Sequence, residues 1–165
     1  MLYLLYQVEV ISMASIAQRI RKIRLLRKMT QRELGLALGF TDRTSDIRIA
    51  QYENGSRTPK EHYIEGLAYV LSVSTTSLTA PDVRDDYDMM HVLFELEDKY
   101  GFRINEINGT LCITVDPFAA PISFSMLHHR LSSWRREYLR LQNGEITQEE
   151  YDLWRYQYPD SDLDQ

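Results

Sequence analysis

The chain has 165 residues, a formal net charge of −5 and a hydrophobic fraction of 44%, values typical of a soluble globular protein with one domain, or a small domain and an appendage. Its single cysteine, Cys112, excludes an intramolecular disulfide and favours a reducing, cytoplasmic setting. No apolar run approaches the roughly 20 residues that span a bilayer.

The charge is divided unevenly along the chain. Residues 13–80 hold eleven Lys and Arg against six Asp and Glu, a balance of +5. Residues 81–165 hold eight against seventeen, a balance of −9. A basic front half and an acidic back half are expected when only the front half contacts phosphate, whereas the acidic half is suited to a protein partner.

The N-terminal residues 1–14 are interpreted as an extension. Met1 to Ser12 read MLYLLYQVEVIS, which is apolar and lacks the basic start of a secretory signal. Met13 opens a more ordinary beginning. We therefore expect either that Met13 is the natural start, or that the first dozen residues form an extra strand or a disordered arm.

Helical periodicity predicts five helices between residues 15 and 80. Ser15 is a suitable N-cap for the first, and Thr30 with Glu33 forms a capping-box pattern at the second, which Gly39 ends. The third is expected to have Ser45 as its N-cap, with Asp46 in its first turn. The fourth is expected from Pro59 to Leu71 and the fifth from Ser74 to Thr79, before a linker at residues 80–82.

The second half has a different pattern. A helix over 87–100 is followed by alternating segments at 102–107 and 110–115, and these flank Asn108-Gly109, a strong hairpin signal. A long helix over 125–142 and a last helix, capped by Thr147 with Glu150, are predicted next. An aromatic stripe runs through these last two helices: Trp134, Tyr138, Tyr151, Trp154, Tyr156 and Tyr158. It is either their shared core or a dimer or partner surface.

Three segments carry a resemblance to a known family. They are MTQRELGLALGF, IAQYENGSRTPK and LAYVLSVSTTSL, in that order. Together they resemble the lambda-repressor/Cro-like, or xenobiotic-response-element type (XRE), helix-turn-helix transcriptional regulators. The resemblance covers about 65 residues and implies a domain whose recognition helix enters the major groove of duplex DNA.

The chain departs from this family between the two helices of the motif. Gly39 and Glu53 are fourteen positions apart, which is more than the family has, so residues 41–44 look like an insertion in the turn. Counted back from Glu53, the expected base-reading residues are Arg48, Gln51, Ile47, Thr44 and Arg43, with Arg suited to guanine, Gln to adenine and Ile to a thymine methyl. A salt bridge from Arg48 to Asp46 or Glu53 is the alternative.

Phosphate contacts are implied by the resemblance on both sides of the recognition helix. The expected residues are Gln31, Asn54, Arg57 and Lys60. The backbone amides at the start of its helix are expected to help Gln31 bind phosphate. The alternative for Gln31 is a plain exposed capping residue. Glu53 is expected to be structural, paired with Arg24 or Arg27.

Catalytic and cofactor chemistry have no support in the sequence. His128 and His129 are adjacent and point in different directions on a helix, and no phosphate-binding loop or nucleophile motif occurs. No enzyme, metal or cofactor is therefore expected. Cys112 is expected to be a small buried apolar residue, with a redox-sensing thiol as the alternative.

The sequence thus predicts a mostly α protein. A five-helix lambda-repressor-like DNA-binding domain over 15–80 precedes a small α+β module over 81–165, consisting of a helix, a β-hairpin and two helices, for dimerisation or partner binding. The expected function is that of a sequence-specific regulator of transcription, a repressor that binds double-stranded DNA as a homodimer. The alternatives are an inhibitor or protein-interaction protein of a phage or mobile element, acting through residues 82–165, and an antitoxin-type regulator.

Overall fold

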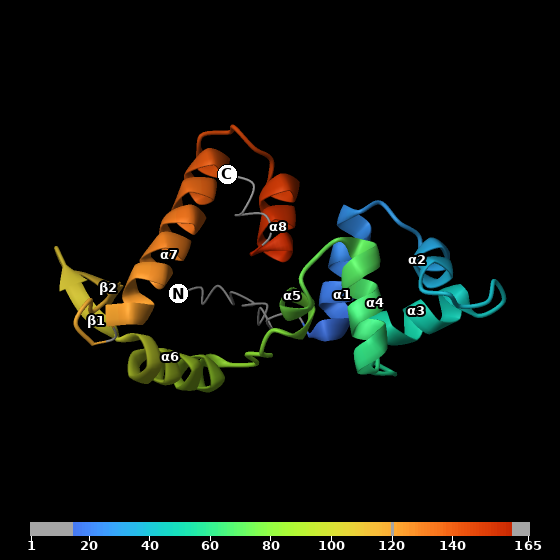
Figure 1. Ribbon diagram of the computed structural model, residues 1–165, viewed down its shortest axis with the longest axis horizontal. Helices are drawn as coiled ribbons and strands as arrows, with labels where there is room; N and C mark the ends of the chain where they lie inside the picture. Colours follow the sequence, from blue (N-terminus) through green and yellow to red (C-terminus); the bar gives the residue numbers. More distant parts are fainter. Residues whose placement is uncertain (1–14, 120, 160–165) are drawn as a thin grey trace, which may run out of the picture. The chain divides into compact units, whose positions relative to one another are not determined.

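The computed structural model describes residues 15–119 and 121–159 (Figure 1). Its elements follow in chain order: α1 (Ile16–Leu26), α2 (Gln31–Ala37), α3 (Ser45–Glu53), α4 (Glu61–Leu71), α5 (Thr75–Thr79), α6 (Asp86–Tyr100), β1 (Phe102–Ile107), β2 (Thr110–Val115), α7 (Pro121–Gln142) and α8 (Gln148–Gln157). The mostly α fold with a single hairpin, predicted from the sequence, is confirmed. The expectations for residues 1–14 lie outside the described residues.

Two compact units make up the described chain. The first contains residues 15–82 and 143–159, and the second contains residues 83–119 and 121–142. The sequence analysis grouped the last helix with the second half, whereas in the structure α8 packs against α1 and α5 of the first unit. Among the described residues, no helix is long and apolar enough to cross a membrane.

The first unit has one hydrophobic core, formed by all five N-terminal helices. Its fully or almost fully buried members are Ile20, Ile23, Leu34, Ile49, Tyr52, Leu67, Ala68, Leu71 and Leu78. Helical spacing places at least two of these residues on the inner face of each of the helices α1, α3 and α4. This core fixes α2 and α3 against a rigid base.

Side-chain caps set most helix starts where the sequence predicted them. Ser15 caps α1, Ser74 caps α5, and the capping boxes of Thr30 with Glu33 and Thr147 with Glu150 are both formed. Two predicted starts in the first unit were wrong. α3 is capped by Thr44, so that Ser45 is its first helical residue, and α4 begins at Glu61 rather than at Pro59.

Contacts made by α8 explain its place in the first unit. The Lys22 Nζ atom of α1 lies 2.7 Å from a carboxylate oxygen of Asp152, and also over the ring of Tyr156. The backbone N–H of Ser74 donates to the carbonyl of Tyr156 at 3.1 Å. These are contacts across more than 80 residues of chain, and local periodicity contains no signal for them.

The second unit is built on α6 and the antiparallel hairpin of β1 and β2. Phe102 pairs with Val115 and Ile107 with Thr110, so that the turn consists of Asn108 and Gly109, both at positive φ. That conformation is the reason for the Asn-Gly sequence, since few other residues adopt it in a two-residue hairpin loop. α7 begins with Pro121, four residues before the predicted start.

Candidate nucleic-acid interface

The close approach of α2 and α3 depends on Gly35. A Cβ atom at this position would lie only 2.4 Å from the carbonyl oxygen of Ser45, the first residue of α3. Ser45 is completely buried at this contact. Because neither backbone can move without disturbing the core, glycine is the residue that allows the two helices to cross at this distance.

A buried ion pair holds the end of α3. Arg24 of α1 donates to both carboxylate oxygens of Glu53, at 2.6 and 2.9 Å, and also to the carbonyl of Met29. The hydrogen bond that Arg24 donates to Glu53 raises the pKa of Arg24, which keeps the guanidinium charged. The prediction that Glu53 is structural and pairs with Arg24 is therefore confirmed. Arg27, the other predicted partner, instead donates to the carbonyls of Leu71 and Ser72.

Gln31 joins this ion pair. Its side-chain amide donates to Glu53 Oε2 at 2.9 Å, and its side chain is half-buried. The predicted phosphate ligand thus has one N–H directed inward, to the carboxylate that also receives Arg24. The two ends of the motif, the start of α2 and the end of α3, are consequently linked by a single hydrogen-bonded group.

The long turn between α2 and α3 is ordered by its own contacts. The guanidinium of Arg32 binds the carboxylate of Asp42 in a bidentate manner, with distances of 2.6 and 2.7 Å from one nitrogen, while the hydroxyls of Thr41 and Thr44 lie 2.9 Å apart. Ser45 donates to the carbonyl of Asp42. The inserted residues therefore form a defined loop before α3, and Arg43 is exposed on it.

Phe40 anchors the start of this loop. Its ring packs with Tyr52 of α3 and Tyr63 of α4, at centroid distances of 6.4 and 5.1 Å. Phe40 also contacts Arg48 of α3, which the sequence did not predict. The Arg48 guanidinium carbon lies over the Phe40 ring, 5.0 Å from its centroid.

Four of the five predicted base-reading residues lie on one face of α3. Thr44, Ile47, Arg48 and Gln51 are spaced by three or four positions, which aligns them along a helix. Ile47 is 54% exposed, although such a residue would ordinarily be buried. The opposite face, with Ser45, Ile49 and Tyr52, is buried in the core. The fifth predicted residue, Arg43, precedes the helix.

The predicted phosphate ligands after α3 differ in what their side chains do. Asn54 accepts a hydrogen bond from the backbone N–H of Ser56 at 2.9 Å and so shapes its own loop. The Arg57 backbone N–H donates to the carbonyl of Gln51, which fixes the backbone at the base of an exposed side chain. Lys60 caps α4 through its carbonyl, and its side chain is also exposed.

The basic residues of the first unit fall into two groups. Arg19 and Arg24 are buried, and Arg19 donates to the carbonyls of Leu78, Ala80 and Pro81. A charged residue is expected on the outer face of a helix, and for these two arginines that expectation is wrong; their positions next to Ile20 and Ile23 along α1 were the available signal. Within the described part of the chain, Arg43, Arg57 and Lys60 make no ion pair. The basic residues that flank α3 along the chain, Arg43, Arg57 and Lys60, are thus exposed.

A comparison with protein families agrees with this geometry. Residues 20–78 match a family model described as helix-turn-helix, and no curated protein matches the chain. The family is one of DNA-binding regulators and is not typically enzymatic. In the described residues, no cluster of His, Cys, Asp or Glu suits a metal ion. Residues 20–78 thus belong to the XRE-type, lambda-repressor/Cro-like helix-turn-helix family of DNA-binding transcription regulators.

Proposed function

We propose that this regulator is a sequence-specific repressor that binds a two-fold operator in duplex DNA as a homodimer. The observation that carries the proposal is a stripe on α3 that is not buried in the core, formed by the exposed Ile47 and the half-buried Thr44, Arg48 and Gln51, on a helix whose other face is packed in the core. A helix of this size fits the major groove, which is about 12 Å wide. One recognition helix covers few base pairs, and a dimer doubles the site.

Arg48 is the proposed reader of guanine. The cation–π contact with Phe40 uses none of the N–H donors of the guanidinium, which are therefore able to reach the guanine O6 and N7 atoms. Gln51, one turn further along, is placed to pair with adenine, and Ile47 to contact a thymine methyl. The fixed position of Arg48 reduces the entropy lost on binding.

Positioning on the DNA backbone is proposed for the flanking residues. Arg43 precedes α3, whereas Arg57 and Lys60 follow it, so that exposed positive charge lies beyond both ends of the recognition helix. Such contacts to phosphate fix orientation without reading sequence. Gln31 is proposed to contact phosphate through its remaining N–H, and Asn54 to act by shaping the loop that carries Arg57.

The test is selection of bound duplexes from a random pool with the full chain. The winning sites are expected to be two-fold symmetric, and Arg48→Ala is expected to cost about 1–3 kcal/mol and relax the preference at one base pair in each half-site. Arg57→Ala is expected to weaken binding to all duplexes equally and reduce the salt slope by about 1. Repression is tested by placing the selected site in a reporter promoter.

The control removes the same charge elsewhere. Arg135 is an exposed residue of α7 in the second unit, and Arg135→Ala is expected to leave both affinity and sequence preference unchanged. The proposal fails if no duplex is enriched, or if Arg48→Ala and Gln51→Ala bind the selected site as the parent chain does.

A protein-interaction role is the second candidate. It is favoured by the exposed apolar side chains of the second unit, among them Leu111 at 73% and Phe118 at 88% exposure. It predicts that the protein, when purified from its natural host, is bound to a polypeptide of different sequence. Native mass spectrometry checks this, and a species that contains only copies of this chain contradicts it.

A further inference from the structure

Within residues 15–119 and 121–159, the hairpin of the second unit has an edge on β2 that pairs with no other strand. The sheet has two strands, and the backbone N–H of Asp116 donates to the carbonyl of Gly101 at the base of the hairpin. Backbone groups alternate in direction along an antiparallel strand. Thr110, Cys112 and Thr114 therefore bond to β1, whereas Leu111, Ile113 and Val115 direct their N–H and C=O groups outward from the sheet.

This edge carries no charged side chain. Residues 108–115 read NGTLCITV, whereas β1 contains Arg103 and Glu106. Edge strands in monomeric proteins are commonly protected by charges or proline against pairing with another chain. Pairing of a strand with its own copy about a two-fold axis brings like residues close together, so an uncharged strand is electrostatically suited to pair with itself.

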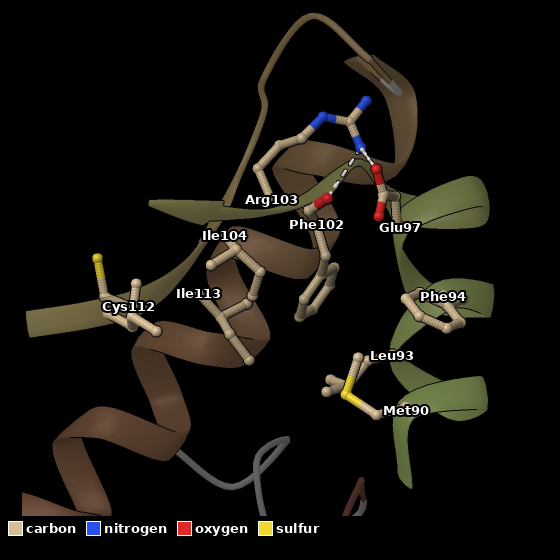
Figure 2. Close-up of a pocket in the computed structure, with 10 residues that line it drawn as sticks. Met90, Leu93, Phe94, Glu97, Phe102, Arg103, Ile104, Cys112 and Ile113 are labelled. Carbon is tan, nitrogen blue, oxygen red and sulfur yellow. Dashed lines mark hydrogen bonds and ion pairs between the residues drawn. The ribbon is translucent and has the colours of Figure 1, made fainter. Parts of the chain in front are cut away.

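The apolar face of the hairpin is incompletely covered. Ile104, Leu111 and Ile113 are 64%, 73% and 49% exposed. Figure 2 shows α6 facing the hairpin, with side chains of both elements around the space between them. This space is an open hollow of about 290 Å³. Side chains of both elements line it, among them Met90, Leu93, Phe94, Phe102 and Ile104. A two-stranded hairpin is marginally stable alone and gains from further strands on its apolar surface.

We propose that β2 pairs with β2 of a second copy, so that two hairpins form one four-stranded antiparallel sheet. The two-fold axis passes at Ile113, which places Leu111 opposite Val115 of the second copy and Cys112 opposite Thr114 of the second copy. This register pairs every outward backbone group of Leu111, Ile113 and Val115. It also joins the exposed apolar side chains across the axis. The inference rests on the homodimer of the proposed function and specifies its contact.

The first test removes one outward N–H from each edge of the hairpin. Ile113→Pro deletes the central donor of β2 without touching a bond to β1, since proline is accepted on an edge strand. Ile104→Pro is the matched control, because Ile104 is the cross-strand partner of Ile113 and its N–H points outward from β1. The dimer dissociation constant of the full chain, from sedimentation equilibrium without DNA, is expected to rise about 100-fold for Ile113→Pro. Ile104→Pro is expected to leave it unchanged.

The second test does not require that the hairpin tolerate a proline. Cys112 is the sole cysteine. Thr114→Cys places a second thiol opposite Cys112 of the other copy, in a non-hydrogen-bonded pair whose Cα atoms are about 4.5 Å apart. Oxidation with copper phenanthroline is expected to give a disulfide-linked dimer on a non-reducing gel. Ile107→Cys, on the same face of β1, is expected to give none.

The outcomes separate this inference from the proposed function. A parent chain that is monomeric throughout, a dimer insensitive to Ile113→Pro, or equal cross-linking of Thr114→Cys and Ile107→Cys each overturns the β2 contact. DNA binding is measured separately, with the selected duplex. A chain that dimerises as described and enriches no duplex overturns the proposed function and leaves the contact standing.

Discussion

The two units of the molecule differ in how completely they bury their apolar side chains. In the first unit, Ile20, Ile23, Leu34 and Ile49 have no exposed surface at all. In the second, no apolar side chain that the structure describes is buried to this degree, and Met90, Phe94 and Ile113 are each more than 40% exposed. Apolar periodicity in the sequence is similar in both, so a periodic pattern predicts a helix or strand without predicting that it is covered.

This difference has a consequence for function. A DNA-reading helix must be held in one orientation, and the first unit achieves this with a closed core and the Arg24–Glu53 pair. The association surface that we propose for the second unit must be open in the single chain, and the uncharged edge strand and the apolar hollow agree with that requirement. The difference in burial also implies that substitutions of apolar or paired residues cost more stability in the first unit than in the second.

The largest effect is expected from Glu53→Ala in the first unit. Removal of the carboxylate leaves the Arg24 guanidinium buried beside an empty site and also frees Gln31. Loss of one partner of a buried ion pair costs about 3–5 kcal/mol of unfolding free energy. Urea unfolding followed by the fluorescence of Trp154, in a Trp134→Phe background, measures it. Glu65→Ala, at an exposed position of α4, is the control, and a loss for Glu53→Ala no larger than that of the control contradicts the buried-pair reading.

A smaller effect, and a direct contrast, is expected from one substitution made in both units. Ile23→Ala removes a fully buried side chain of α1 and is expected to cost about 3 kcal/mol, whereas Ile104→Ala acts at a position 64% exposed and is expected to cost less than about 1 kcal/mol. Unfolding is followed by fluorescence in two single-tryptophan backgrounds. The background that keeps Trp154 reports on the first unit, and the one that keeps Trp134 reports on the second. Equal losses at low protein concentration would contradict the difference in burial.

Much of the local structure in both units could be predicted from short stretches of sequence. Capping boxes at Thr30 and Thr147 and the Asn108-Gly109 turn are short-range signals whose geometry is set within a few residues. The pair of Arg24 and Glu53 was predicted through the family resemblance, which supplied the long-range contact that composition does not contain. The stripe on α3 followed from the same counting back from Glu53.

The remaining features depend on contacts between distant segments. Docking of α8 on α1 requires Asp152 and Tyr156 to meet Lys22. Arg19 and Arg27 bind backbone carbonyls at residues 71–81, although their charge suggested an outer face. The insertion at residues 41–44 was visible as extra length, but its order comes from Arg32 and Asp42, ten positions apart. Charge alone does not distinguish an arginine that binds phosphate from one that caps a helix.

The smallest expected effect concerns pH and the cap of α2 in the first unit. The pKa of Glu33 lies below its ordinary value of 4.5, first because its carboxylate accepts the backbone N–H of Thr30 and then because it accepts the Thr30 hydroxyl. A lowered folded-state pKa stabilises the fold fully above the unfolded value, and this contribution disappears as the pH falls through the folded-state pKa. Glu33→Ala is therefore expected to lower the Tm of the first unit slightly at pH 7 and to have a smaller effect near pH 3. An equal loss for Glu33→Ala at both pH values would assign its effect to packing rather than to the charged cap.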